Sequence, residues 1–162
     1  TLILDIKQPI LLVTDPGREQ EVITRLSRVG YDNVLGYLEG GFDAWKKSGK
    51  EIDTVRRISA EEFEKEVSQN HNKVIDVRKE NEFAAEHLEI ADSLPLAYIN
   101  AWMNNIDDSE HFYIHCAGGY RSMIAASILN SRGIRNFTEI AGGYGAIKNT
   151  SLAKTNFVCQ GK

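Results

Sequence analysis

The feature that most constrains the fold of this chain is an internal repeat. Residues 9–45 and 111–147 follow the same order of patterns: a short apolar run, a small polar loop, a helical stretch, a second apolar run and a Gly-Gly-aromatic ending. The pair Gly40-Gly41 in the first copy corresponds to Gly142-Gly143 in the second. Short apolar runs without alternation are typical of strands covered on both faces. Strand–helix–strand units with short connections predict an α/β fold, in which a central parallel sheet has helices on both faces.

The residues between the two copies complete only the second one. A helical stretch begins at Ser59 with the Ser-x-x-Glu pattern of a capping box, and a strand pattern follows over 73–78. Further turn and helix patterns then lead into the second copy. We expect two domains: residues 1–54 hold the second half of one unit, and residues 55–162 hold a complete unit. Because the chain begins at Thr1 and inside an incomplete copy, we expect it to be part of a longer protein.

Composition excludes several functional classes. The chain has 162 residues and a net charge of −4 with both signs interspersed, so it lacks the basic surface of a nucleic-acid-binding protein. No apolar run reaches the length that crosses a membrane, and no signal-peptide pattern is present. Two cysteines and four scattered histidines provide neither a disulfide framework nor metal-ligand spacing. We expect no metal site, no nucleic-acid or membrane partner, and a location in the reducing cytoplasm.

The second copy carries distinctive chemistry directly after the strand pattern of residues 112–115. A loop there leads to a helix that we expect to begin at about Ser122, and its residues are Cys116, Ala117, Gly118, Gly119, Tyr120, Arg121 and Ser122. Such a loop lies at the carboxyl end of the strands, where open α/β sheets bind ligands. Gly118 and Gly119 permit positive φ, so backbone N–H groups turn inward, and the helix N-terminus and Arg121 add positive charge. These groups lower the pKa of a thiol, and we expect Cys116 to be a nucleophile beside a bound anion.

An ordinary structural role is the alternative for Cys116. A free cysteine is often a small buried apolar residue, and for an isolated cysteine that role is the more common one. The strand end, the paired glycines, the arginine and the following helix together favour the nucleophile. The other cysteine, Cys159, has no comparable neighbours, so we expect Cys116 to be the only functional thiol.

The loop pattern Cys-x-x-Gly-x-Arg-Ser resembles the active-site loop of the rhodanese superfamily of sulfurtransferases. Residues 74–88 resemble that family's Asp-Val-Arg segment, and residues 139–147 resemble its closing Gly-Gly-aromatic helix. The resemblance implies a rhodanese-like fold and a reaction that needs no cofactor in this chain. In that reaction Cys116 takes a sulfane sulfur from thiosulfate or a persulfide, becomes a cysteine persulfide, and passes the sulfur to a thiol or cyanide.

The resemblance also implies roles for the residues around the cysteine. Arg121 acts with Cys116 in catalysis and helps to hold the small anionic donor. The residues implied in substrate binding are Ala117, Gly118, Gly119, Tyr120 and Ser122. Asp76 and Arg78 are implied as supporting residues beside the loop, and an ordinary surface ion pair is the alternative for them. His115, which directly precedes the cysteine, is expected to be a satisfied core histidine, with tuning of the thiolate as the alternative.

The first copy resembles the second half of another rhodanese domain, but Thr14 or Asp15 stands where the cysteine should be. We therefore expect residues 1–54 to be catalytically inactive. An incomplete copy followed by a complete one is similar to bacterial proteins that fuse a metallo-β-lactamase-like domain to tandem rhodanese repeats. That resemblance implies an upstream metallo-β-lactamase-like domain, to which any metal would belong. It leaves the oligomeric state open.

Two other functions remain as alternatives at this point: a phosphatase or arsenate reductase on the same fold, and a non-catalytic regulatory module. Four residues lie between Cys116 and Arg121, whereas the corresponding loop of related phosphatases holds five. The reacting atom must lie close to the sulfur, so the shorter loop favours a single terminal sulfur over a phosphoryl group. The sequence also shows only one arginine that faces the site, Arg121, and no evident acid nearby to protonate a leaving alcohol. Sulfur transfer is therefore our leading hypothesis.

Overall fold

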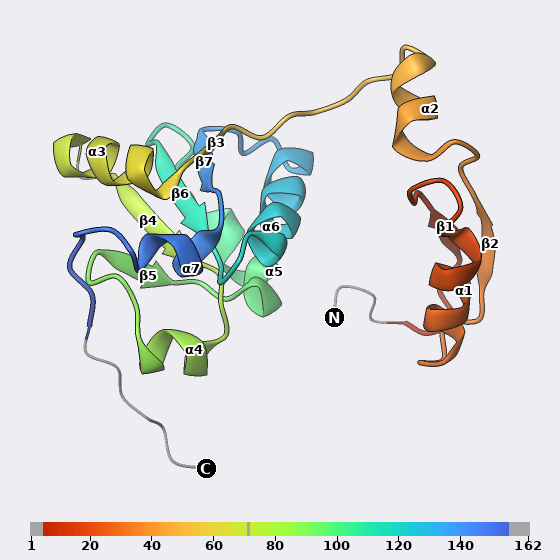
Figure 1. The fold of residues 1–162 in the computed structure, drawn as a ribbon, viewed down its shortest axis with the longest axis horizontal. Helices are drawn as coiled ribbons and strands as arrows, with labels where there is room; N and C mark the ends of the chain where they lie inside the picture. Colours follow the sequence, from red (N-terminus) through yellow and green to blue (C-terminus); the bar gives the residue numbers. More distant parts are fainter. Residues whose placement is uncertain (1–4, 71, 156–162) are drawn as a thin grey trace. The chain divides into compact units, whose positions relative to one another are not determined.

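The computed structural model describes residues 5–70 and 72–155. The chain divides into two compact units, Thr1–Asp53 and Thr54–Lys162, which are described separately (Figure 1). None of the helices in the described parts of the chain is long and apolar enough to cross a membrane.

A five-stranded parallel sheet forms the centre of the second unit, as the repeat predicted. The strand order is β3-β7-β6-β4-β5, and every neighbouring pair is parallel. The strands are β3 (Arg57–Ile58), β4 (Lys73–Asp76), β5 (Ala91–Ser93), β6 (Phe112–His115) and β7 (Phe137–Ile140). Because β6 lies between β4 and β7, all four of its side chains are buried. The expected strand at residues 112–115 is therefore confirmed as a central strand.

Helices lie on both faces of this sheet (Figure 1), which confirms the expected α/β architecture. They are α3 (Ala60–Asn70), α4 (Glu80–Ala85), α5 (Ile99–Trp102), α6 (Tyr120–Ser131) and α7 (Gly143–Ile147), and the short 3-10 helices η1 (Leu96–Tyr98) and η2 (Met103–Asn105) flank α5. Alternate side chains of β6 enter two separate apolar clusters. Phe112 and Ile114 pack with residues of α5 and α6, whereas Tyr113 packs with residues of α3 and α7. The sheet is thus covered by apolar contacts on both faces.

The start of α3 shows how the sequence fixes one of these covering helices. The Ser59 hydroxyl accepts a hydrogen bond from the Glu62 N–H at 3.2 Å, and the Glu62 carboxylate accepts one from the Ser59 N–H at 2.9 Å. This reciprocal pair is the predicted capping box, and it satisfies two N–H groups that the first helical turn leaves free. Phe63 and Val67, one turn apart, are both buried against the sheet.

The first unit repeats part of this plan on a smaller scale. It contains β1 (Ile10–Leu12), α1 (Glu19–Ser27), β2 (Val34–Tyr37) and α2 (Gly41–Lys47), with β1 and β2 paired in parallel. Among its described residues only Leu12 and Gly41 are buried, and Leu11 and Leu35 are 75% and 66% exposed. A two-stranded sheet with exposed apolar side chains has little core of its own.

Candidate active site

The cysteine predicted to be reactive lies where the central strand ends. Cys116 directly follows β6, and α6 begins at Tyr120, two residues before the expected start. The helix begins early because Gly119, its N-cap residue, has a φ of 100°. Gly118 does not have positive φ, so the prediction that both glycines use left-handed backbone is correct only for Gly119. Arg121 and Ser122 therefore lie in the first helical turn.

The sulfur of Cys116 is surrounded by hydrogen-bond donors. The Gly119 N–H lies 3.2 Å from Sγ, and the Ser122 hydroxyl lies 3.4 Å from it. Burial of the thiol raises its pKa, but hydrogen bonds from Ser122, Gly118 and Gly119 outweigh that effect, so the pKa of Cys116 lies below its usual value. The residue is only 1% exposed. The hydrogen bonds thus favour the thiolate, although the side chain is almost fully buried.

The start of α7 holds this loop from behind. The Tyr144 N–H donates to the Cys116 carbonyl at 2.6 Å, and the Gly145 N–H donates to the Ala117 carbonyl at 2.9 Å. Gly143 has a φ of 54°, and a Cβ at this position would lie 2.3 Å from the Cys116 carbonyl oxygen. Only glycine permits this approach of two backbone segments, so the Gly-Gly pattern in the sequence serves the reactive loop.

Arg121 has a partner that the sequence analysis did not identify. Its guanidinium donates to both carboxylate oxygens of Glu82 in α4, at 2.6 and 2.8 Å. Hydrogen bonding to this guanidinium is the main reason that the pKa of Glu82 lies below its usual value. An acidic residue therefore lies near the loop, but its lowered pKa makes it a poor donor of a proton to a leaving alcohol. Arg121 still adds positive charge, but it shares that charge with a carboxylate 39 residues away in the sequence.

Asp76 and Arg78 form a buried ion pair, which rules out the surface pair considered as their alternative. Asp76 is fully buried and Arg78 is 5% exposed. The Arg78 Nε donates to Asp76 at 2.7 Å, its Nη2 donates to the Glu86 carbonyl at 2.8 Å, and its guanidinium lies 4.2 Å from the Tyr144 ring centroid. The Tyr144 N–H also donates to the Cys116 carbonyl, so the Asp76–Arg78 pair supports the wall of the reactive loop through Tyr144.

His115, the residue before the cysteine, is fully buried on the α7 side of β6. Burial lowers its pKa, although nearby Asp76 opposes that effect. Its Nδ1 lies 3.2 Å from the Cys116 carbonyl oxygen, and its Nε2 has no hydrogen-bond partner among the described residues. The histidine is therefore a core residue, as expected, but only half of its hydrogen-bonding capacity is used.

Two further charged residues lie close to the loop and were missed by sequence reasoning. Glu139 in β7 is fully buried, and its carboxylate accepts hydrogen bonds from the Ser122 hydroxyl at 2.7 Å and from the Arg57 Nε at 2.6 Å. The Arg57 Nη2 lies 3.5 Å from where a Cβ on Gly119 would stand. Arg57 is therefore a further arginine beside the loop, in addition to the Arg121 that the sequence analysis expected to face the site. A charged residue between Thr138 and Ile140, inside a buried strand, was the available signal.

A cavity of about 330 Å³ opens beside Ala117. Its walls come from α4, α7 and the end of β4, and its lining residues are Arg78, Glu82, Ala85, Glu86, Ala117, Tyr144, Gly145 and Lys148. Tyr120, expected to bind substrate, is 80% exposed and does not line this cavity. Ser122 is fully buried and lies behind the cysteine rather than at the mouth. Cys159 lies outside the described residues.

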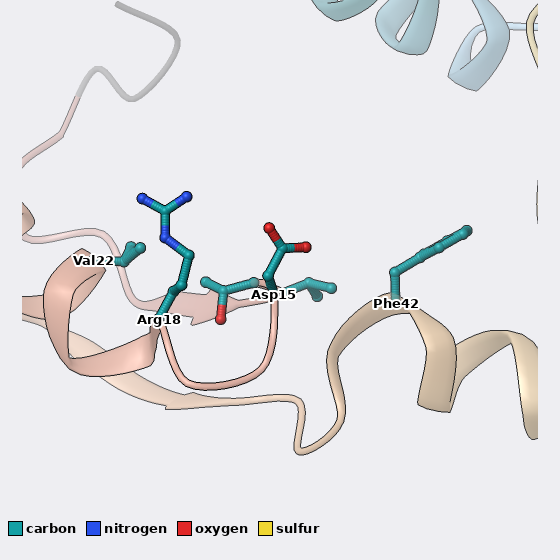
Figure 2. A pocket seen from close by; sticks show the side chains of 6 residues that line it. Asp15, Arg18, Val22 and Phe42 are labelled. Atoms are coloured by element: carbon teal, nitrogen blue, oxygen red, sulfur yellow. The ribbon is translucent and has the colours of Figure 1, made fainter.

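The first unit has a loop at the equivalent position. A Cβ on Gly41 would lie 2.2 Å from the Thr14 carbonyl oxygen, which matches the approach of Gly143 to Cys116. This correspondence places Thr14, rather than Asp15, at the cysteine position. Figure 2 shows Asp15 and Arg18 extending to the same side of this loop, where they line a cavity of about 340 Å³ with Phe42 at its edge. The loop of the first unit therefore presents a hydroxyl-bearing residue in place of the thiol.

The described parts of the chain contain no candidate metal site. Among residues 5–70 and 72–155, no group of three or more histidine, cysteine, aspartate or glutamate side chains is placed to hold a metal ion.

Comparison with known proteins identifies the family of the second unit. The profile of the rhodanese-like domain family matches residues 59–150. The chain is 27% identical to a solved rhodanese-like domain protein from Staphylococcus aureus, with a TM-score of 0.56, over 61% of this chain and 97% of that one. The matched segment contains every residue of the reactive loop and both partners of its buried ion pairs, except Arg57.

Two proteins of Bacillus subtilis (strain 168) are also similar. The chain is 25% identical to the "Putative sulfur carrier protein YrkF" over 59% of this chain and 52% of that protein. It is 31% identical to the protein YqhL over 56% of this chain and 70% of that protein. The chain thus spans about half the length of the first of these relatives.

Proposed function

This chain belongs to the rhodanese-like domain family, and we propose that it is a sulfurtransferase that moves a sulfane sulfur through a persulfide on Cys116. The observation that carries the proposal is the position of the Cys116 sulfur, which lies inside a short loop with N–H and hydroxyl donors around it. Such a loop stabilises a thiolate before the reaction and a negatively charged sulfur after it.

The first half-reaction is a displacement at sulfur. The Cys116 thiolate attacks the outer sulfur of thiosulfate, a new bond forms between Sγ and that sulfur, and the bond to the sulfonate sulfur breaks. Sulfite leaves with the electron pair, and Cys116 becomes a persulfide anion. A persulfide donor reacts in the same way and releases a thiolate. The lowered pKa of Cys116 favours the thiolate, so we assign no separate general base.

In the second half-reaction, an acceptor thiolate or cyanide attacks the outer sulfur of the persulfide. The bond between the two sulfurs breaks, the sulfur leaves with the acceptor, and the Cys116 thiolate is restored. The cavity beside Ala117 gives the reactants a route to the loop, and Arg78, Arg121 and Lys148 lie at or near its walls. Arg78 and Arg121 are paired with Asp76 and Glu82, so Lys148 and the N–H groups of the loop are the groups that favour a small anionic donor.

The proposal is tested by intact mass after incubation with thiosulfate. We expect a gain of one sulfur that dithiothreitol removes and that is absent in Cys116→Ser. Cys159→Ser is the matched control, and we expect it to gain the sulfur as the wild type does. Hydrolysis of an aryl phosphate faster than sulfur uptake would instead favour the phosphatase, and neither activity would favour a non-catalytic module.

We also propose that residues 1–54 form an incomplete, inactive copy of the same unit. The support is the shared approach of Gly41 to Thr14 and of Gly143 to Cys116, together with the missing thiol. The Cys116→Ser variant keeps this unit intact, so any sulfur that it still takes up in a Cys159→Ser background would contradict the proposal.

A further inference from the structure

A buried carboxylate lies directly behind the reactive sulfur and has no role in the proposed displacement. Glu139 is fully buried in β7, between β3, which contains Arg57, and β6, which Cys116 directly follows. One carboxylate oxygen accepts a hydrogen bond from the Ser122 hydroxyl at 2.7 Å, and the other accepts one from the Arg57 Nε at 2.6 Å. Ser122 therefore links the carboxylate to the sulfur, which lies 3.4 Å from its hydroxyl oxygen.

The Ser122 hydroxyl has one proton for three acceptors. These are a Glu139 oxygen at 2.7 Å, the Gly119 carbonyl at 3.1 Å and the Cys116 sulfur at 3.4 Å. A hydrogen bond to an ionised carboxylate is shorter and stronger than one to a neutral acceptor, so an ionised Glu139 takes the proton. The hydrogen bond from the hydroxyl to Cys116 is then weakened, so Ser122 lowers the pKa of the thiol less than it would with Cys116 as its sole acceptor.

Arg57 gives the buried Glu139 carboxylate a charged partner, because its Nε lies 2.6 Å from a Glu139 oxygen. A buried carboxylate needs such a partner to offset the loss of its water. The Arg57 side chain is 47% exposed, so its own charge is largely solvated and costs little to hold there. The Arg57 Nη2 would lie 3.5 Å from a Cβ built on Gly119, so the guanidinium lies beside the loop.

We propose that the Arg57–Glu139 pair positions the Ser122 proton away from Cys116 and thereby limits ionisation of the thiol. This inference deepens the proposed function and rests on it, because it takes Cys116 to be the reacting group. In a persulfide the negative charge lies on the outer sulfur, farther from Glu139, so the same pair favours the sulfur-loaded form over the bare thiolate. Glu139 and Arg57 are positioning residues, since neither touches the donor.

Two other pairs of charged residues lie around the loop, and Glu86 and Lys148 line the cavity beside Ala117. Asp76 at the end of β4 is paired with Arg78, and Glu82 of α4 is paired with Arg121 of α6. His115 of β6 is buried, and burial lowers its pKa, which keeps it neutral. A substitution at Glu139 leaves these groups in place, so its effect on the thiol reports the Ser122 route and the Glu139 charge.

The test is the pH titration of the Cys116 thiolate by its ultraviolet absorbance, in a Cys159→Ser background so that one thiol remains. Glu139→Gln keeps the shape of the side chain and places an amide donor beside Ser122, which frees the hydroxyl proton for the sulfur. We expect the midpoint to fall by about one pH unit. Glu139→Leu, which has no acceptor at all, should shift the midpoint in the same direction and serves if the first variant fails to fold.

Glu139 can act on the thiol through the Ser122 hydroxyl or directly through its own charge. A double-mutant cycle separates these two routes. In a Ser122→Ala background the hydroxyl is absent, and we expect Glu139→Gln to shift the midpoint by less than half as much. An unchanged or higher midpoint in both Glu139 variants would overturn the proposal, and so would an equal shift in the two backgrounds. The titration needs no sulfur transfer, so a failed mass gain with a shifted midpoint would count against the proposed function alone.

Discussion

The contact between α7 and the reactive loop allows a quantitative prediction. In Gly143→Ala, the new methyl group would lie 2.3 Å from the Cys116 carbonyl oxygen and 2.9 Å from two carbonyl carbons, whereas ordinary contact begins at 3.4 Å. The left-handed backbone at this position costs an L-residue about 1–2 kcal/mol. Relief of the overlap by shifting the backbone adds about 1–3 kcal/mol. We therefore expect a total loss of about 2–5 kcal/mol in the free energy of unfolding.

Gly133→Ala is the matched control. Gly133 follows α6 with a φ of 84°, and a Cβ there would meet nothing within 4 Å. This variant has only the backbone cost, about 1–2 kcal/mol, and its site is far from the loop in the fold of α6. It should therefore keep the wild-type rate of sulfur uptake at temperatures where it is folded.

The two variants differ most in activity. The overlap in Gly143→Ala must move the Cys116 carbonyl by about 1 Å, and a misplacement of that size costs about a hundredfold in rate. Urea unfolding gives the stability of each variant, and the rate of mass gain from thiosulfate gives its activity. If Gly143→Ala unfolds like Gly133→Ala and takes up sulfur at the wild-type rate, α7 does not position the loop and the reasoning is wrong.

Three further predictions concern the charged groups around the loop. Asp76→Ala leaves the Arg78 guanidinium buried without its partner, and we expect urea unfolding to show a loss of about 3–5 kcal/mol; a loss below about 1 kcal/mol would contradict the burial of this pair. Glu82→Gln removes the charge that Arg121 shares, so the KM for thiosulfate should fall severalfold, and an unchanged KM would mean that Arg121 does not act on the donor. Burial lowers the pKa of folded His115, so on acidification the unfolded chain binds the proton first, and stability should fall as the pH drops below about 6.5. The stability of His115→Gln should decline less steeply between about pH 7 and 5, and a decline equal to that of the wild type would refute this.

The order of strands, loops and helices could be read from the sequence because each of these features is local. The apolar run at residues 112–115, the glycines after Cys116 and the helical stretch beyond them are consecutive, and they form β6, the reactive loop and α6. The capping box at Ser59 was equally local and was confirmed. The start of α6 was misplaced by two residues because either Gly119 or Ser122 can precede a first helical turn, and backbone torsion decides between them.

The partners of the site residues could not be read in this way because they are distant in the sequence. Glu82 lies 39 residues before Arg121, and Arg57 lies 82 residues before Glu139. Arg57 meets Glu139 because the strand order places β3 beside β7, and Glu82 meets Arg121 because β4, which α4 follows, lies beside β6, which leads to α6. Nothing in the local pattern around Arg57 distinguishes it from a surface arginine.

The sequence by itself determined the α/β class, the reactive loop and its cysteine, because strand and helix patterns and the Cys-x-x-Gly-x-Arg-Ser motif each lie within one stretch of chain. The tertiary structure decided the electrostatics of that loop. Burial removes water from Asp76 and Glu139, and each carboxylate must then find an arginine or a hydroxyl within reach of the fold. Which partner it finds depends on strand order and on a few tenths of an ångström between side chains, and neither quantity is encoded in the local sequence pattern.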